Sequence, residues 1–230
     1  MRLSLGVLGM RYRLRDNLYA AKADKLILLD LEADRYFALP PSLEMALREV
    51  IAQPETTDPA CENIALLVRQ KLIVEEPTVA SNPDTAILPA AERELILPAC
   101  VRPHWTLTAQ LAAIQINMAI KCRAMGLNRL RADTFRSRAR YAPRQDSGLE
   151  TYFLIAASFA KLDYIFPVAD RCLVRTLSFL RASHVRGYFP SFVVGVQARP
   201  FSAHCWAQSG DLVLNDRLEN VAGYVPILVI

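Results

Sequence analysis

Short apolar runs dominate the first part of the chain, where they alternate with polar turn signals. Residues 18–40 read LYAAKADKLILLDLEADRYFALP, and the strand-sized runs are broken at residues 23–24 and 32–34 by Asp and small residues. Runs of this length and spacing predict antiparallel strands.

A helical pattern follows a pair of prolines. Apolar residues recur at spacings of three and four over residues 43–51, and Ser42 is expected to cap this helix. A second helix is expected over residues 58–70, and residues 71–76 then form a short strand or wing. Small antiparallel strands beside two or three helices indicate a winged-helix-like module over residues 1–80.

A change of composition separates this module from the rest of the chain. The stretch near residues 76–90 holds three prolines and small polar residues without periodicity, which is typical of a linker. We assign residues 81–95 to this linker and residues 96–230 to a second domain.

The second domain begins with helical periodicity and ends with strand-sized runs. Its first helix carries an apolar stripe interpreted as core, formed by Leu107, Leu111, Ile114, Met118 and Cys122. Further helices are expected over residues 127–140, 149–162 and 171–184. The β-rich runs SFVVGVQ, FSAHCWAQ, DLVLND and YVPILVI follow, so helices precede an antiparallel sheet and the fold class is α+β.

Composition and charge narrow the class of protein. Hydrophobic residues make up 53% of the chain, yet the longest apolar runs are strand-sized and the first residues lack the apolar stretch of a signal peptide. The expected location is therefore the cytoplasm. Residues 1–85 hold 10 basic and 13 acidic residues, whereas residues 121–144 hold eight basic residues and one acid. This basic stretch fits a nucleic acid, an acidic partner or peptide, or a solvated helix face.

The cysteines and histidines give little sign of a metal site. Five cysteines lie at positions 61, 100, 122, 172 and 205, without a Cys-x-x-Cys pair. Their odd number and spacing predict neither a disulfide framework nor a zinc ribbon. His104 with Cys100 would supply only two ligands, and His184 is expected at the surface or as a helix C-cap. No glycine-rich phosphate loop is present, so no ATP site is expected. Neither a metal nor another cofactor is expected for this chain.

One cysteine lies where a helix is expected to begin. Asp170 is a good N-cap, which places Cys172 in the first helical turn. The partial positive charge of a helix N-terminus favours thiolate over thiol and lowers the pKa of a cysteine, and Arg171 and Arg175 would add to this effect. Cys172 is therefore a candidate nucleophile, with a buried structural cysteine as the alternative.

His204 is the candidate general base, because a histidine in the middle of the strand FSAHCWAQ is a poor choice for packing alone. Trp206 shares its face and would shield the imidazole from water. If residues 209–211 form a three-residue hairpin loop, Asp216 falls directly opposite His204, within reach of a hydrogen bond. A two-residue loop would instead place Asn215 opposite His204.

The order of these residues resembles the lasso-peptide B proteins, a family of transglutaminase-like leader peptidases. Their pattern is a cysteine opening a leucine-rich helix, a Gly-Val strand, an Ala-His-x-Trp strand and an Asn-Asp segment. The matching residues here are Cys172, Gly195-Val196, Ala203-His204-Cys205-Trp206 and Asn215-Asp216. The match is close over residues 150–230 and looser over 90–150. It implies a transglutaminase/papain-like cysteine protease domain with Cys172, His204 and Asp216 as its catalytic triad.

The first 80 residues resemble a PqqD-like precursor-recognition element through the segment LDLEADRYFALPPS. The resemblance implies that a leader peptide adds as a strand to a sheet edge and packs beside a helix. On that basis Arg35, Tyr36 and Phe37 are the predicted leader-binding residues, together with the helix near residues 62–70.

The resemblance also implies a reaction and two partners. Cys172 attacks the leader–core peptide bond, His204 protonates the leaving amine, water resolves the thioester, and Asp216 orients His204. The Cys172 backbone N–H would supply part of an oxyanion hole, for which no second donor can be assigned. The partners are the lasso peptide precursor and a separate asparagine-synthetase-like, ATP-dependent cyclase.

Three other functions stay open at this point. The same triad serves acyl transfer to an amine. A pure adaptor would present the precursor without catalysis, so that a Cys172→Ala variant would still mature it. A winged-helix DNA binder is the third, although the net acidic character of residues 1–85 argues against phosphate binding.

Overall fold

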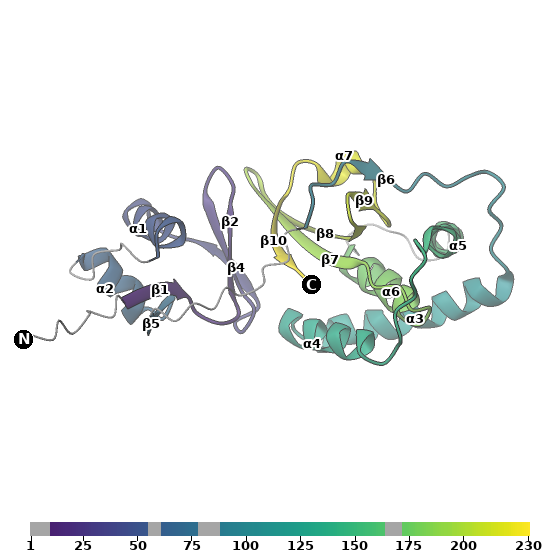
Figure 1. Ribbon diagram of the computed structural model, residues 1–230, viewed down its shortest axis with the longest axis horizontal. Coiled ribbons are helices and arrows are strands. Elements are labelled where there is room, and N and C mark those ends of the chain that lie inside the picture. Colours follow the sequence, from purple (N-terminus) through teal and green to yellow (C-terminus); the bar gives the residue numbers. More distant parts are fainter. Residues whose placement is uncertain (1–9, 55–60, 78–87, 164–171) are drawn as a thin grey trace, which may run out of the picture. The chain divides into compact units, whose positions relative to one another are not determined.

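The polypeptide divides into two structural units, Met1–Thr85 and Ala86–Ile230, in the computed structural model of the chain (Figure 1). The structure describes residues 10–54, 61–77, 88–163 and 172–230. The two units are described separately below.

Two small antiparallel sheets form the strands of the first unit. One has the order β2-β3-β4, with β2 over Leu18–Lys22, β3 over Leu26–Asp30 and β4 over Arg35–Ala38. The other pairs β1, Met10–Leu14, with β5, Ile73–Pro77. The apolar pattern of the chain predicts the strands of the first sheet and β5 but not β1, whose sequence MRYRL carries too few apolar residues to stand out.

The turn between β3 and β4 is held by one buried carboxylate. Asp30 accepts hydrogen bonds from the backbone N–H groups of Glu32 and Ala33 at 3.0 and 3.1 Å, and it pairs with Arg15 at 2.6 Å. These hydrogen bonds hold the pKa of Asp30 below its ordinary value although burial raises it. The turn predicted at residues 32–34 is therefore fixed by Asp30, the last residue of β3.

Two helices complete the first unit, α1 over Pro41–Ala52 and α2 over Glu62–Arg69. The prediction that Ser42 caps α1 is wrong, because the helix begins at Pro41 with Pro40 in the N-cap position. A proline in the first turn has no N–H that needs a partner, so the helix begins there without a side-chain cap. The predicted start of the second helix at residue 58 lies outside the described residues.

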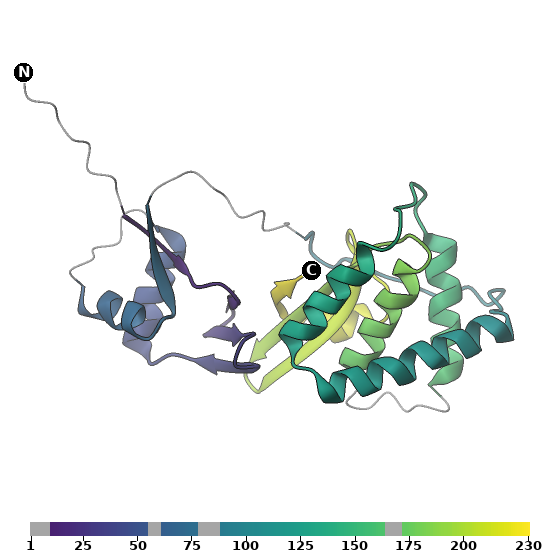
Figure 2. The same cartoon turned by 90° about the horizontal axis from the view of Figure 1, so that it is seen from below.

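Four helices open the second unit: α3 over Trp105–Ala124, α4 over Leu127–Arg138, α5 over Leu149–Leu162 and α6 over Cys172–His184. The bounds of α4, α5 and α6 agree with the predicted ranges to within two residues. In the predicted stripe of α3, Leu111 and Met118 are buried, whereas Leu107, Ile114 and Cys122 are only partly buried. Figure 2 shows α3 running across α5 and α6, which explains why its inward face is interrupted.

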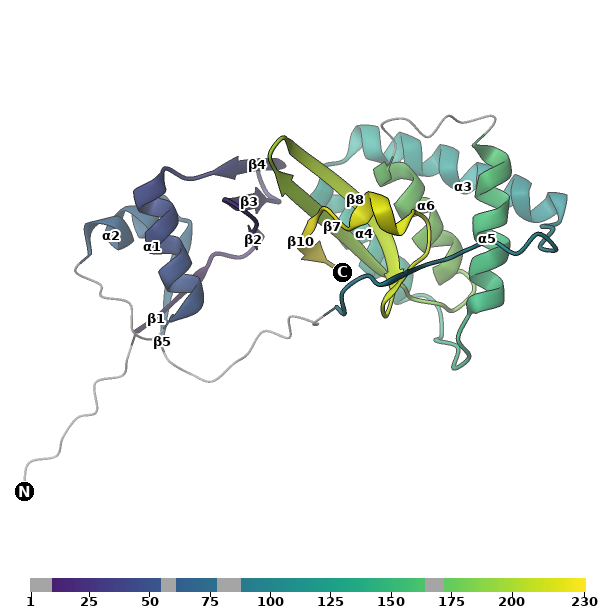
Figure 3. The same ribbon diagram turned by 90° about the horizontal axis from the view of Figure 1, so that it is seen from above.

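A five-stranded sheet closes the second unit, in the order β10-β7-β8-β9-β6. Its strands are β6 over Arg93–Glu94, β7 over Ser191–Ala198, β8 over Phe201–Ser209, β9 over Leu212–Val213 and β10 over Val225–Val229. A short helix, α7 over Leu218–Val221, lies between β9 and β10. The four helices gather on one face of the sheet and α7 lies on the other (Figures 1 and 3).

The end of the predicted linker is part of this sheet. Arg93 and Glu94 form β6, which runs parallel to β9, and Arg93 also pairs with Asp211 at 2.6 Å. The assignment of residues 88–95 to a linker is therefore wrong, and residues 81–87 lie outside the described residues. Two paired residues are too short a strand to produce a hydrophobic pattern in the sequence.

Helix α6 is the central helix of the second unit. Every residue from Thr176 to His184 except Arg181 is buried, and α6 packs against β7 and β8. Burial on all sides means that this helix cannot shift without disturbing the core. Its first residue, Cys172, is therefore held by a rigid element. Among the helices of the described ranges, none combines the length and apolar character that crossing a bilayer requires.

Candidate active site

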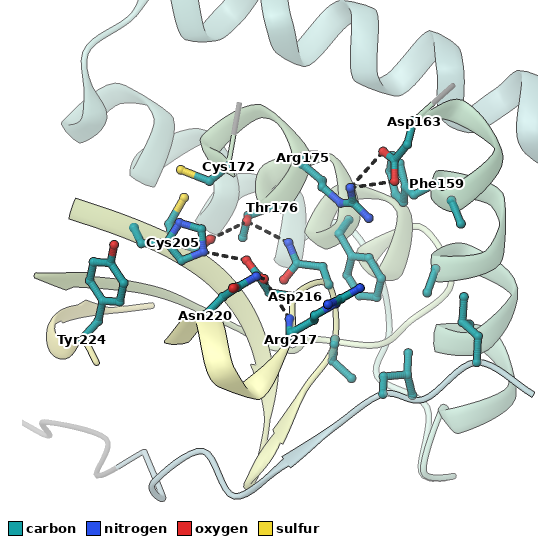
Figure 4. Close-up of a pocket in the computed structure, with 18 of the residues that line it drawn as sticks. Phe159, Asp163, Cys172, Arg175, Thr176, Cys205, Asp216, Arg217, Asn220 and Tyr224 are labelled. Carbon is teal, nitrogen blue, oxygen red and sulfur yellow. Dashed lines mark hydrogen bonds and ion pairs between the residues drawn. The ribbon is translucent and has the colours of Figure 1, made fainter. Parts of the chain in front are cut away.

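A cleft of about 900 Å³ lies at the start of α6 (Figure 4). Cys172, His204 and Asp216 all line it, from α6, β8 and the segment after β9. The remaining lining is mixed: Leu95, Phe159 and Leu214 are apolar, whereas Asp163, Arg175 and Asn220 are among its polar residues. The structure thus brings the three residues predicted from the sequence to one concave surface.

Cys172 is the first residue of α6 and is partly buried. Its thiol has a pKa of about 4, well below the ordinary value, because it hydrogen bonds with the thiol of Cys205 and with His204, and these outweigh burial. Arg175 was expected to help lower the pKa of Cys172. Its guanidinium instead donates to both carboxylate oxygens of Asp163 at 2.9 Å. The predicted Asp170 cap and Arg171 lie outside the described residues.

His204 and Asp216 form a short hydrogen bond, 2.6 Å between Nε2 and Oδ2. The bond to Asp216, followed by the one to Cys172, raises the pKa of His204 to about 9. Burial pushes the pKa of Asp216 upward, but hydrogen bonds from His204, Asn220 and the Arg217 backbone lower it overall. The site therefore favours a thiolate beside an imidazolium, with a charged carboxylate behind.

Asp216 reaches His204 by a route that differs from the predicted hairpin. The observed register pairs two residues of β8 with two of β9, Gln208 with Val213 and Ser209 with Leu212. The hairpin therefore closes through Gly210 and Asp211 rather than through three residues. Gly210 has φ of 58°, the positive value that two-residue hairpin turns require and that glycine adopts without strain. In this register neither Asp216 nor Asn215 would fall opposite His204 along a regular ladder.

The chain leaves the sheet just before Asp216. The last regular bond runs from the Leu214 N–H to the Ala207 carbonyl, at 2.9 Å. The next residue, Asn215, then uses its side chain, whose Oδ1 accepts from the Ala207 N–H at 2.7 Å. Asn215 Nδ2 donates to the buried Thr176 Oγ1 at 2.9 Å. Asn215 is thus a brace between β8 and α6 rather than the partner of His204, and it turns Asp216 toward the imidazole.

Two aromatic rings enclose His204. The Trp206 ring lies 6.4 Å from the imidazole between centroids, and the Tyr224 ring lies at 5.5 Å. Gly195 pairs with His204 across the sheet, and a Cβ at this position would come within 2.8 Å of both Trp206 and Tyr224. The expected shielding by Trp206 is therefore present, and it depends on a glycine opposite the histidine.

These features agree with a comparison of the sequence with known families. The family model of the transglutaminase-like superfamily matches residues 112–229, about half of the chain, including α6, β8 and the segment that carries Asp216. The chain belongs to the transglutaminase-like superfamily. This fold serves cysteine proteases and acyl transferases. No curated protein and no solved structure gives a match.

Hydrogen bonds between β6 and α7 and between α7 and Asp216 hold the Asp216 carboxylate in place, and the sequence did not reveal them. Glu94 of β6 accepts a hydrogen bond from the Leu218 N–H at 2.6 Å, at the start of α7. Helix α7 carries Asn220, whose Nδ2 donates to Asp216 Oδ1 at 2.8 Å. Glu94 and Leu218, more than 100 positions apart in the chain, thus help to fix the carboxylate of Asp216. No local sequence pattern predicts such a contact.

The other candidate residues lie apart from the cleft. The expectation that His184 lies at the surface is wrong: it is 2% exposed and bonds to Ser137 Oγ at 3.1 Å. Burial, with Arg138 and Arg181 nearby, lowers its pKa to about 4, so it is neutral. Cys100 and His104 are both exposed. Within the described ranges, no group of three or more His, Cys, Asp or Glu residues is arranged to hold a metal ion.

The predicted leader-binding residues form most of β4 in the first unit. Arg35 is exposed, and its guanidinium lies 5.3 Å from the centre of the Phe37 ring. Tyr36 and Phe37 are partly buried, and Phe37 packs with Leu66 of α2 against the core of the first unit. β4 is an edge strand of its sheet, so its position suits the pairing of another extended segment.

Proposed function

We propose that this chain is a cysteine peptidase that removes the leader peptide from a lasso peptide precursor, with Cys172, His204 and Asp216 as its catalytic triad. The observation that carries the proposal is the 2.6 Å bond between His204 Nε2 and Asp216 Oδ2 in the cleft that also contains Cys172. Nucleophilic catalysis needs a thiolate, an imidazole and a group that orients the imidazole.

In the first half of the reaction, the Cys172 thiolate attacks the carbonyl carbon of the last leader residue. The electron pair of the C=O bond moves to oxygen, and the tetrahedral intermediate then expels the amine of the first core residue. His204, protonated at rest because its pKa is about 9, gives its proton to this amine. The leader is left attached to Cys172 as a thioester.

In the second half, water replaces the amine. His204 is now neutral and takes a proton from water, which attacks the thioester carbonyl and releases Cys172 as a thiolate. Asp216 stays ionised throughout, because its pKa is below the ordinary value, and it stabilises the imidazolium in both halves. Nucleophile, base and orienting group are all side chains of this chain, so the proposed reaction needs no cofactor.

The first unit is proposed as the PqqD-like element that binds the leader. The edge strand β4 offers main-chain hydrogen-bonding groups to an extended peptide, which gives affinity with little dependence on sequence. Arg35, Tyr36 and Phe37 would then supply selectivity, beside α2. Binding at this edge raises the local concentration of the cleavage site, because leader and core are parts of one precursor.

The proposal places the enzyme before a ring-forming step. Cleavage frees the amine of the first core residue, and joining that amine to a carboxylate requires activation. A separate ATP-dependent, asparagine-synthetase-like cyclase is the proposed partner for that step, and the cytoplasm, where ATP is available, is the proposed location.

Mass spectrometry of a reaction with the precursor tests this function. The wild-type protein should release two fragments whose masses together equal the precursor plus one water, and a Cys172→Ala variant should release neither. Formation of an amine adduct in place of the water product would indicate acyl transfer. Full maturation by Cys172→Ala in the presence of the cyclase would indicate a non-catalytic adaptor.

A further inference from the structure

A second thiol contacts the proposed nucleophile. Figure 4 shows the sulfur atoms of Cys172 and Cys205 next to each other, and the two thiols hydrogen bond. Cys205 lies in β8 directly after His204, and both cysteines line the cleft. We propose that Cys172 and Cys205 form a reversible disulfide when the enzyme meets a hydroperoxide, which switches off catalysis and protects the nucleophile.

The backbone fixes the two cysteines in this relation. Thr176 lies four residues after Cys172, on the same side of α6, because side chains four positions apart are neighbours on a helix. Thr176 is fully buried, and its Oγ1 donates to the carbonyl oxygen of Cys205 at 3.1 Å. This bond ties β8 at Cys205 to α6 at Thr176, one helical turn after Cys172. The Cys205 thiol therefore lies next to the Cys172 thiol.

The two thiols differ in ionisation and exposure, so they can act as an attacking and a resolving cysteine. Cys172 is the thiolate and faces the cleft, whereas Cys205 is 4% exposed and its pKa is raised well above the ordinary value, first by its hydrogen bond to Cys172. Of these two thiols, Cys172 is therefore the one that attacks a hydroperoxide. Since this inference depends on a reactive Cys172, it rests on the proposed function.

The chemistry proceeds in two balanced steps. The Cys172 thiolate attacks one oxygen of the hydroperoxide, the O–O bond breaks, and the other oxygen leaves as an alcohol or water after taking a proton, which His204 can supply. Cys172 is then a sulfenic acid. The Cys205 sulfur attacks the sulfenic sulfur, its proton joins the departing hydroxide, and water and a disulfide result.

Oxidation of Cys172 itself prepares Cys205 for the second step. Once Cys172 is a neutral sulfenic acid, the negative charge that raises the Cys205 pKa is gone. The Cys205 thiol then ionises more readily and becomes a better nucleophile. The buried thiol is thus inert in the working enzyme and reactive only after Cys172 has been oxidised.

Peptide mapping tests the inference without any assay of peptidase activity. The protein is treated with hydrogen peroxide, its remaining thiols are blocked, and it is digested with trypsin. Trypsin releases Cys172 in the peptide 172–175 and Cys205 in the peptide 187–217, because Pro200 prevents cleavage after Arg199. We expect a mass loss of about 2 Da in the intact protein and a linked pair of these two peptides, both reversed by dithiothreitol.

Cys205→Ala and the milder Cys205→Ser are the test variants, and Cys61→Ala and Cys100→Ala are matched controls at exposed cysteines. In the test variants Cys172 should advance to sulfinic and sulfonic acids, gains of about 32 and 48 Da that dithiothreitol does not reverse. The controls should behave like the wild type.

Two results would overturn the inference. One is a wild-type protein in which Cys172 reaches the sulfinic acid as fast as in Cys205→Ala, with no linked peptide pair. The other is a disulfide that joins Cys172 to Cys61, Cys100 or Cys122. Either result leaves the peptidase proposal intact, whereas failure of precursor cleavage with a normal disulfide would count against the peptidase proposal alone.

Discussion

His204 Nε2 lies 2.6 Å from Asp216 Oδ2, although the two residues are not paired in the sheet that carries His204. The contact exists because the chain leaves the sheet after Leu214 and because Asn220 and the Arg217 N–H hold the other carboxylate oxygen at 2.8 Å. With Nε2 engaged in this way, the other ring nitrogen, Nδ1, remains for exchange of a proton with Cys172.

Replacing Asp216 by Asn should impair the reaction while the fold persists. The amide removes the charge that is the largest cause of the raised pKa of His204. We expect kcat to fall by about 10²–10⁴-fold, as for the loss of an orienting carboxylate in other triads. Steady-state cleavage of the precursor measures this effect. Glu219→Gln, an exposed carboxylate on α7, is the control and should keep wild-type kcat; equal losses in both variants would contradict the role of Asp216.

The pH profile of precursor cleavage should be bell-shaped. Below about pH 4 the Cys172 thiolate gains a proton, and above about pH 9 the His204 imidazolium loses the proton that the leaving amine needs. The profile of kcat/KM reports both ionisations in the free enzyme. A rate that rises with a single pKa near 8.5, the value of an ordinary cysteine, would mean that no ion pair forms.

Cys205→Ala should raise the pKa of Cys172, because the hydrogen bond with Cys205 is the largest cause of its depression. The rate of alkylation by iodoacetamide, followed on the peptide 172–175 as a function of pH, gives this pKa directly. The exposed Cys61 and Cys100 in the same samples provide internal references. An unchanged alkylation profile would show that His204 alone stabilises the thiolate.

Gly195→Ala should damage the site more than the fold. The added Cβ would lie 2.8 Å from Trp206 and Tyr224, so the rings around His204 must shift. Overpacking of this kind costs about 1–3 kcal/mol of stability, and the displaced rings should lower kcat as well. Thermal unfolding and kcat are measured together against Gly223→Ala, whose new Cβ meets nothing within 4 Å. Wild-type kcat in Gly195→Ala would rule out a role for this packing.

Several parts of this arrangement were predictable from the sequence and several were not. The helices and the strands β7 and β8 are long segments that composition and turn signals delimit, and Cys172 at a helix start and His204 within a strand are local features. The hairpin register was not predictable, because the segment around Gly210 fits a two-residue or a three-residue loop, and the loop length decides which residue falls opposite His204.

Contacts between distant segments were also invisible in the sequence. Glu94 of β6 accepts a hydrogen bond from the first residue of α7, and Asn220 of α7 donates to Asp216. His184 lies on a face of α6 that packs against α4, where it bonds to Ser137. Cys205 appeared to be one more buried thiol, and its importance follows from the structure because it faces Cys172 in space rather than in sequence.

Phe37→Ala should weaken binding of the leader peptide without changing the chemical step. The Phe37 ring lies on the edge strand β4, where it packs against Arg35. We expect Kd for a synthetic leader peptide to rise about tenfold, the loss of one well-packed aromatic contact. Isothermal titration measures it, and Tyr19→Ala on the opposite edge strand, β2, is the control. A larger effect from Tyr19→Ala would place the leader on the other edge of the sheet.

Rapid acid quenching of a single turnover is the measurement that tests the catalytic account most directly. A thioester between Cys172 and the leader should accumulate, and it is stable enough at low pH for digestion and mass spectrometry. The account predicts the mass of the leader on the peptide 172–175. Appearance of cleaved precursor with no adduct on that peptide, or with the leader attached to a different residue, would contradict it.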